Sequence, residues 1–130
     1  MESNFSNIKY PLQEETFRII GLCMEIHHIL GKGLLEIVYK DAFEYELNKN
    51  GIPLEREKKY EIMYKDIILP HHYYADFVVW DKIIIEIKSQ RNLIEEHYNQ
   101  IINYLAISKC KIGLIINFGE SSLKYKRIIL

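Results

Sequence analysis

Three charged side chains lie within two predicted β-strands that are otherwise apolar, and they constrain the fold more than any other feature. The strands are expected at residues 74–80 and 83–88 and contain Asp76, Glu86 and Lys88, while Asp81 and Lys82 join the two strands. Residues two apart in a strand share a face, so Glu86 and Lys88 point one way while the alternating isoleucines point the other. Two opposite charges on an isoleucine-rich strand indicate either a solvated outer face or a site that uses them.

The chemistry of these three residue types indicates what a functional site built from them could do. Two carboxylates such as Asp76 and Glu86 can hold a hard divalent cation through oxygen ligands. A nearby lysine can stabilise the charge of a phosphoryl transition state or position the attacking water. The pattern D-x(n)-[DE]-x-K is typical of metal-dependent phosphodiester cleavage on a small α/β core. The alternative interpretation, a solvated Glu86–Lys88 pair, stays open on these residues alone.

The length and composition predict one ordinary globular domain. The chain has 130 residues, of which 48% are hydrophobic and 27% charged, with a net charge of −1. Residues 1–11 are predicted to form an N-terminal arm and residues 12–130 the domain. No apolar run has the length of a membrane span, and the first residues lack the pattern of a signal peptide, so we expect a cytoplasmic protein that does not bind membranes.

The net charge and the two cysteines say little about the function of the chain. The near-neutral total gives no global attraction to nucleic acid. Basic side chains do gather in two segments, residues 56–65 and 124–127, which more often form solvated faces than binding patches. Cys23 and Cys110 fit no metal-binding spacing and are predicted to be free thiols, with Cys23 buried on a helix face.

Hydrophobic periodicity predicts the element order α-α-β-β-β-α-β-β, an α/β sheet flanked by helices. The expected helices span residues 16–30, 34–50 and 94–108. A β region alternates over residues 60–64, turns at 65–66 and continues at 67–69, and Pro70-His71-His72 breaks it. Further strands are expected at 74–80, 83–88, 111–118 and 125–130. The buried helix faces are predicted to include Ile19, Leu22, Cys23, Ile26, Ile29 and Leu30, then Leu35, Val38, Tyr39, Ala42 and Tyr45, and finally Tyr98, Ile101, Ile102 and Leu105.

This order matches the α-β-β-β-α-β core of the PD-(D/E)XK nucleases, and further motifs extend the match. One motif, Gly33-Leu34-Leu35-Glu36-Ile37-Val38-Tyr39, has the form G-x-x-E-x-x-Y. The others are Glu25-Ile26-His27, Tyr74-Ala75-Asp76-Phe77-Val78-Val79, Glu86-Ile87-Lys88, Gln100-x-x-x-Tyr104-Leu105 and Gly113-Leu114-Ile115-Ile116-Asn117-Phe118. Together they resemble the GxxExxY proteins, small bacterial and archaeal proteins placed in the PD-(D/E)XK superfamily. The resemblance covers about residues 12–130 and implies a restriction-endonuclease-like fold, with a central mixed β-sheet flanked by helices.

The resemblance also implies a site and an activity. The catalytic residues would be Glu36, Asp76, Glu86 and Lys88. The ligands of a Mg²⁺ or Mn²⁺ ion would be Glu36, Asp76, Glu86 and the carbonyl of Ile87. Gln100, Tyr104 and Tyr39 would position the substrate, which is expected to be nucleic acid, DNA before RNA.

Two other functions fit the same residues. The chain could be a non-catalytic module that binds nucleic acid or a partner protein on a nuclease-like fold. It could also be a structural subunit, with exposed edge strands or the final Ile128-Ile129-Leu130 as a contact between copies or with a partner. Carboxylate-dependent binding of Mn²⁺ would favour the nuclease over both.

Overall fold

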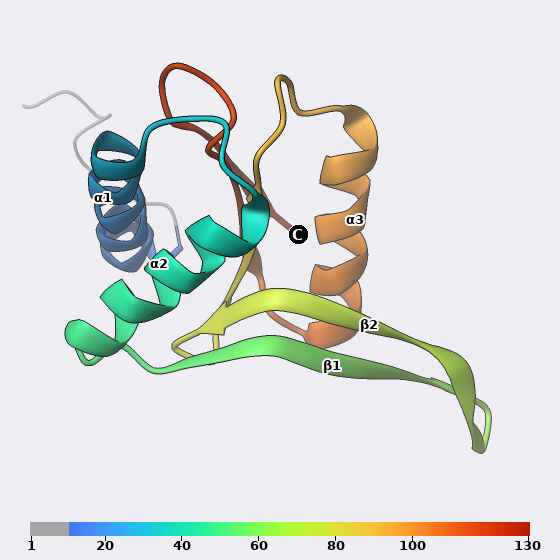
Figure 1. Cartoon of the computed structure of the whole chain (residues 1–130). Coiled ribbons are helices and arrows are strands. Elements are labelled where there is room, and N and C mark those ends of the chain that lie inside the picture. The colour runs from blue at the N-terminus through green and yellow to red at the C-terminus, as the bar shows by residue number, and fades with distance from the viewer. Residues whose placement is uncertain (1–10) are drawn as a thin grey trace, which may run out of the picture.

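The computed structural model describes residues 11–130, which form one β-sheet with a layer of helices on each face (Figure 1). The helices are α1 (Gln13–Leu30), α2 (Glu36–Lys49) and α3 (Glu95–Ser108), and the strands are β1 (Leu54–Tyr64), β2 (Ile67–Val79), β3 (Ile83–Lys88), β4 (Ile112–Asn117) and β5 (Lys124–Ile129). The predicted arm, residues 1–11, lies outside the described residues except for Pro11. Among the helices of residues 11–130, none is both long and apolar enough to cross a membrane.

The five strands form one mixed sheet in the order β1-β2-β3-β4-β5. Three neighbouring pairs are antiparallel, whereas β3 and β4 are parallel because α3 connects them as a crossover. The sheet places α1 and α2 over one face and α3 over the other (Figure 1). The predicted element order and the mixed, helix-flanked sheet are confirmed.

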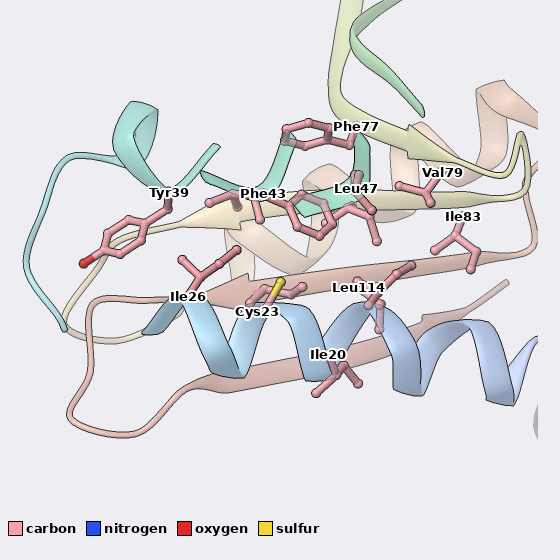
Figure 2. Packing of buried hydrophobic residues seen from close by; sticks show 14 of the residues in the cluster. Ile20, Cys23, Ile26, Tyr39, Phe43, Leu47, Phe77, Val79, Ile83 and Leu114 are labelled. Atoms are coloured by element: carbon pink, nitrogen blue, oxygen red, sulfur yellow. The ribbon is translucent and has the colours of Figure 1, made fainter. Parts of the chain in front are cut away.

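Each face of the sheet has its own hydrophobic core. Ile83, Ile85 and Ile87 of β3 pack in the larger core, against α1 and α2, together with Cys23 and Phe43 (Figure 2). The smaller core lies under α3 and contains Ala75, Val78, Ile84, Ile101, Tyr104, Leu105 and Ile115. The alternation predicted for β3 is therefore present, and it turns Glu86 and Lys88 away from the larger core.

The stripe of α2 that packs on the sheet differs from the predicted one. The helix buries Tyr39, Phe43 and Leu47, a strict i, i+4, i+8 series, whereas the predicted Leu35 is 74% exposed. Leu35 is the N-cap residue, since the helix begins one residue later, and Val38 and Tyr45 are exposed because the stripe is rotated about the helix axis. Ile29 near the end of α1 is likewise 68% exposed, contrary to the prediction.

The first hairpin is longer than predicted. β1 begins at Leu54, six residues earlier than expected, and β2 continues through Pro70 to Val79 without the predicted break. Proline is tolerated there because β2 pairs with β3 only over Phe77–Val79, so Pro70 lies on a part of β2 that has no second partner strand. The β1–β2 register shifts beside it, between Glu61 and Met63.

Candidate active site

The two motif carboxylates meet where β2 and β3 separate. The ladder between these strands ends at the pair Phe77 and Ile85. Beyond it, the Asp76 amide donates to Glu86 Oε2 at 2.8 Å, and the Ile87 amide donates to Asp76 Oδ2 at 2.8 Å. Side-chain oxygens thus replace the missing ladder carbonyls. Asp76 is 8% exposed and Glu86 2%, so both carboxylates are held in place and largely shielded from water.

Burial and the neighbouring charge make Glu86 an unusual acid. Burial raises the pKa of Glu86 to about 8, with a further contribution from the negative charge of Asp76, against smaller opposing effects of its hydrogen bond and of Lys88 and Lys40. Two carboxylates this close disfavour joint ionisation unless a cation joins them. Without a divalent ion, Glu86 therefore keeps its proton at neutral pH.

This raised pKa predicts an unusual dependence of stability on pH. Between about pH 4.5 and pH 8 the folded Glu86 keeps a proton that the unfolded chain loses. The free energy of unfolding should therefore fall as pH rises through that window, by an amount on the order of a few kcal/mol. Urea denaturation in EDTA at pH 5 and pH 9 measures the fall, and the uncharged Glu86→Gln variant should lack most of it. An equal fall in both proteins would place the titrating group elsewhere.

A lysine that sequence reasoning did not assign to the site also contacts Asp76. Lys40 Nζ lies 2.9 Å from Asp76 Oδ1 and 3.4 Å from Glu57 Oε1. Burial lowers the pKa of Lys40, but the hydrogen bond and charge of Asp76, with a contribution from Glu57, outweigh it and the pKa is raised. Lys40 lies one turn after Glu36 on the same helix face, which is the sequence signal that could have identified it.

Glu57 reaches this ion pair because of a local irregularity in β1. Its φ is 52°, in the left-handed region, while its neighbours Arg56 and Lys58 pair normally with Phe77 and Ala75 of β2. The irregularity lies beside Asp76, at the point where β2 turns its side chains from one core to the other. No composition or spacing pattern in the sequence predicts such a φ.

The motif lysine belongs to a chain of side-chain hydrogen bonds that reaches α3. Lys88 Nζ donates to Gln100 Oε1 at 3.2 Å, and Gln100 Nε2 donates to the Tyr104 hydroxyl at 3.2 Å. The ammonium group can only donate, so it fixes the amide orientation of Gln100. Burial raises the pKa of Tyr104 to about 12, with a further contribution from the charge of Glu86. Tyr104 therefore stays a neutral hydroxyl beside the carboxylates.

Glu36 and Tyr39 do not join this group. Glu36 is the first residue of α2 and borders a hollow of about 470 Å³ with Ser89 and Arg91; within residues 11–130 it is not gathered with Asp76 and Glu86 into a cluster of three acids. Tyr39 is fully buried and stacks on Phe118 at 4.4 Å.

The Tyr39 hydroxyl is used within its own loop. It donates to the Gly31 carbonyl and accepts from the Leu34 amide. Tyr39 therefore shapes the loop that precedes Glu36, and the structure does not bring it to the carboxylates.

Asp76 and Glu86 suit a divalent cation because their carboxylates are hard oxygen ligands. The Lys40 ammonium, 2.9 Å from Asp76 Oδ1, competes with an ion for that oxygen. Mg²⁺ commonly uses only one or two protein carboxylates, with water and substrate phosphate completing its shell. In the described part of the chain, no three His, Cys, Asp or Glu side chains are gathered as a metal site. The residues therefore fit a two-carboxylate site.

Comparison with known proteins identifies the same fold. A model of the PD-(D/E)XK nuclease superfamily matches residues 13–128. The crystal structure of SSO0001 is similar with a TM-score of 0.58 and 21% identity, over 71% of this chain and 48% of that one. This chain thus spans about half the length of that protein, and the likeness concerns the fold. A comparison with curated proteins gives no match. Because the superfamily model covers nearly all of residues 11–130, the chain belongs to the PD-(D/E)XK nuclease superfamily.

Proposed function

We propose that this protein is a Mg²⁺- or Mn²⁺-dependent nuclease that hydrolyses phosphodiester bonds of DNA, and that it is a GxxExxY member of its superfamily. The observation that carries the proposal is the pairing of Asp76 and Glu86 at the point where β2 and β3 separate, with Lys88 two residues further along the same strand face. Superfamily membership supports the nuclease class, and the chemistry of the residues supports the role of a divalent ion.

Each side chain of the site has a role that follows from its surroundings. Asp76 and Glu86 would hold the ion, which when bound would polarise the scissile phosphate and supply a hydroxide nucleophile. Lys88 would neutralise charge on the non-bridging oxygens of the transition state, held in position by Gln100. Tyr104, neutral over the working pH range, can donate its hydroxyl proton to a phosphate oxygen.

Glu36 and Ile87, which were both predicted as ion ligands, have less direct roles in this proposal. Glu36 borders the adjacent hollow and would face the substrate or its bound water rather than share an ion closely with Asp76. The Ile87 amide is already bound to Asp76, and a role for its carbonyl as an ion ligand stays a prediction.

The binding-module alternative is favoured by one observation. Lys40 pairs with Asp76 at 2.9 Å, and an ammonium group there satisfies the carboxylate without any metal. In a protein without catalytic activity, this ion pair could stabilise the buried Asp76 carboxylate in place of a metal ion. Titration with Mn²⁺ separates the two functions, since the nuclease requires that Asp76 and Glu86 prefer the divalent ion.

Cleavage of a substrate panel tests the proposal. Single-stranded and duplex DNA and RNA, linear and circular, would be incubated with Mg²⁺ or Mn²⁺ and with EDTA. We expect cleavage that requires the ion and is strongest on DNA. The same amount of cleavage in EDTA, or in an Asp76→Asn preparation purified in parallel, would contradict the proposal.

A further inference from the structure

A second hollow lies beside the candidate active site, at the end of the molecule where three loops gather. The loops are residues 31–35, 89–94 and 118–123, and they lie together at the top of Figure 1. The hollow measures about 560 Å³ and is lined by Lys32, Arg91, Glu120 and Lys124 with small loop residues. It shares Arg91 and Gly119 with the hollow that Glu36 borders, so the two hollows are adjacent.

Buried hydrogen bonds fix the loops that form this hollow. Asn117, fully buried, accepts from the Gln90 amide and donates to the Gln90 carbonyl, both at 2.9 Å, and also donates to Glu120 Oε2 at 2.9 Å. Gly119 packs directly on the Gln90 backbone, where a Cβ atom would overlap with it. The shape of the hollow is therefore built by these loops.

A third loop is tied to the same two. Ser89 donates to the Leu34 carbonyl at 2.6 Å, and His27 Nε2 donates to the Glu120 carbonyl at 2.9 Å. Ser89 thereby joins the loop after α1 to the loop that follows β3, and His27 joins the last turn of α1 to the loop that follows β4. All three sides of the hollow are held by hydrogen bonds that involve a side chain.

The charges in the hollow are unbalanced. Lys32, Arg91 and Lys124 are exposed, and within residues 11–130 none of them takes part in an ion pair. The one carboxylate in the lining, on Glu120, accepts a hydrogen bond from Asn117, which holds it against the loop. Other exposed lysines of the described chain, among them Lys82, Lys109 and Lys111, also lack an ion pair, but the present hollow lies beside the one that Glu36 borders. Three unpaired cations at this place, next to the candidate active site, point to an anionic ligand.

We propose that this hollow binds a backbone phosphate of the nucleic-acid strand that is cut at Asp76 and Glu86, a proposal that rests on the proposed function for the identity of its substrate. Arg91 follows Lys88 by three residues, so their Cα atoms are at most about 10 Å apart, the reach of a fully extended chain. One strand of DNA advances about 3.4 Å per nucleotide. The phosphate bound here is therefore within about three nucleotides of the scissile bond, and the hollow sets the path of the strand.

The test measures binding rather than cleavage. A fluorescent single-stranded oligonucleotide is titrated in EDTA at several salt concentrations, and the slope of log affinity against log salt is compared between variants. The hollow variant is Lys32→Gln with Arg91→Gln. Its matched control is Lys82→Gln with Lys126→Gln, which removes the same charge from exposed positions outside the hollow, Lys126 being two residues from Lys124.

The hollow variant is expected to bind more weakly, with a salt slope smaller by about 0.7 for each phosphate that the protein no longer neutralises, while the control keeps the wild-type slope. Equal slopes for both variants, or no binding by the wild-type protein, would overturn the proposal. Oligonucleotides with and without a 5′-phosphate should bind alike. A weakening confined to the 5′-phosphorylated strand would overturn the assignment to an internal phosphate in favour of a terminal one.

Cleavage in Mg²⁺ is followed on the same proteins, so that the two proposals can fail separately. If binding depends on the hollow but no ion-dependent cleavage occurs, the nuclease proposal is wrong and the hollow remains a nucleic-acid-binding site. If cleavage occurs but the hollow variant and its control have identical salt slopes, the phosphate-binding proposal is wrong and the nuclease proposal remains.

Discussion

Replacing Lys88 by alanine is expected to slow phosphodiester cleavage about a hundredfold or more, the usual effect of removing one preorganised charge that stabilises a transition state. Lys88 shares β3 and its strand face with Glu86, and its ammonium group donates to Gln100 at 3.2 Å. Its side chain is only partly buried, so the free energy of unfolding should change by less than about 1 kcal/mol. Single-turnover cleavage and urea denaturation of the same preparation measure the two effects.

Two variants bracket this result. Lys82→Ala removes an exposed lysine just before β3, at the opposite end of that strand from Lys88, and should leave cleavage unchanged. Tyr104→Phe keeps the ring packed but removes the hydroxyl that accepts from Gln100, and should slow cleavage much less than Lys88→Ala. If wild-type and Lys88→Ala proteins cut a broad panel equally, the cleavage comes from another site or another protein.

Mn²⁺ is expected to raise the melting temperature of the wild-type protein strongly at pH 8.5. An ion that binds only the folded state stabilises it by about 2.7 kcal/mol when its free concentration is about 100 times the Kd. The measurement belongs above pH 8 because Glu86, with a pKa of about 8, must release its proton before it can serve as a ligand. Differential scanning calorimetry with increasing Mn²⁺ gives the shift.

Glu86→Gln should remove most of this shift, since the amide is a poor replacement for a charged ligand. Glu96→Gln removes one negative charge from the exposed first turn of α3 and should keep the shift. An unchanged melting temperature at millimolar Mn²⁺ would count against a working ion site and favour the binding module. The pH 8.5 shift should exceed that at pH 6, where protonated Glu86 competes with the ion.

The sequence predicts best the parts of the fold that are buried on both sides. β3 matches its predicted bounds and β4 nearly so, because inner strands covered on both faces consist of continuous apolar runs. The start of β1 was missed because Glu55, Lys58 and Lys59 carry no hydrophobic signal, and β2 was divided at Pro70 because nothing local shows that this segment lacks a second neighbour.

The residues of the candidate site also fall into those that the sequence predicts and those that depend on tertiary structure. The pairing of Asp76 with Glu86 and the joining of Lys88, Gln100 and Tyr104 agree with the motif spacing, which reflects the strand and helix periods. The role of Lys40 depends on how α2 rotates against the sheet and on the φ of Glu57. Both are tertiary effects. The motif also placed Glu36 with the carboxylates, whereas the helix start directs it to the neighbouring hollow.

The charged residues that concealed β1 have a consequence for the behaviour of the protein in concentrated solution. β1 and β5 form the two edges of the sheet, and their outer backbone groups are a template for strands of other molecules. β1 carries Lys58 and Lys59, and β5 carries Lys124 and Lys126, whereas β2 and β4 contain no lysine. A strand of another molecule that paired with either edge would draw these charged side chains out of water, which costs free energy. The same residues that weaken the β signal in the sequence therefore protect the folded chain from aggregation.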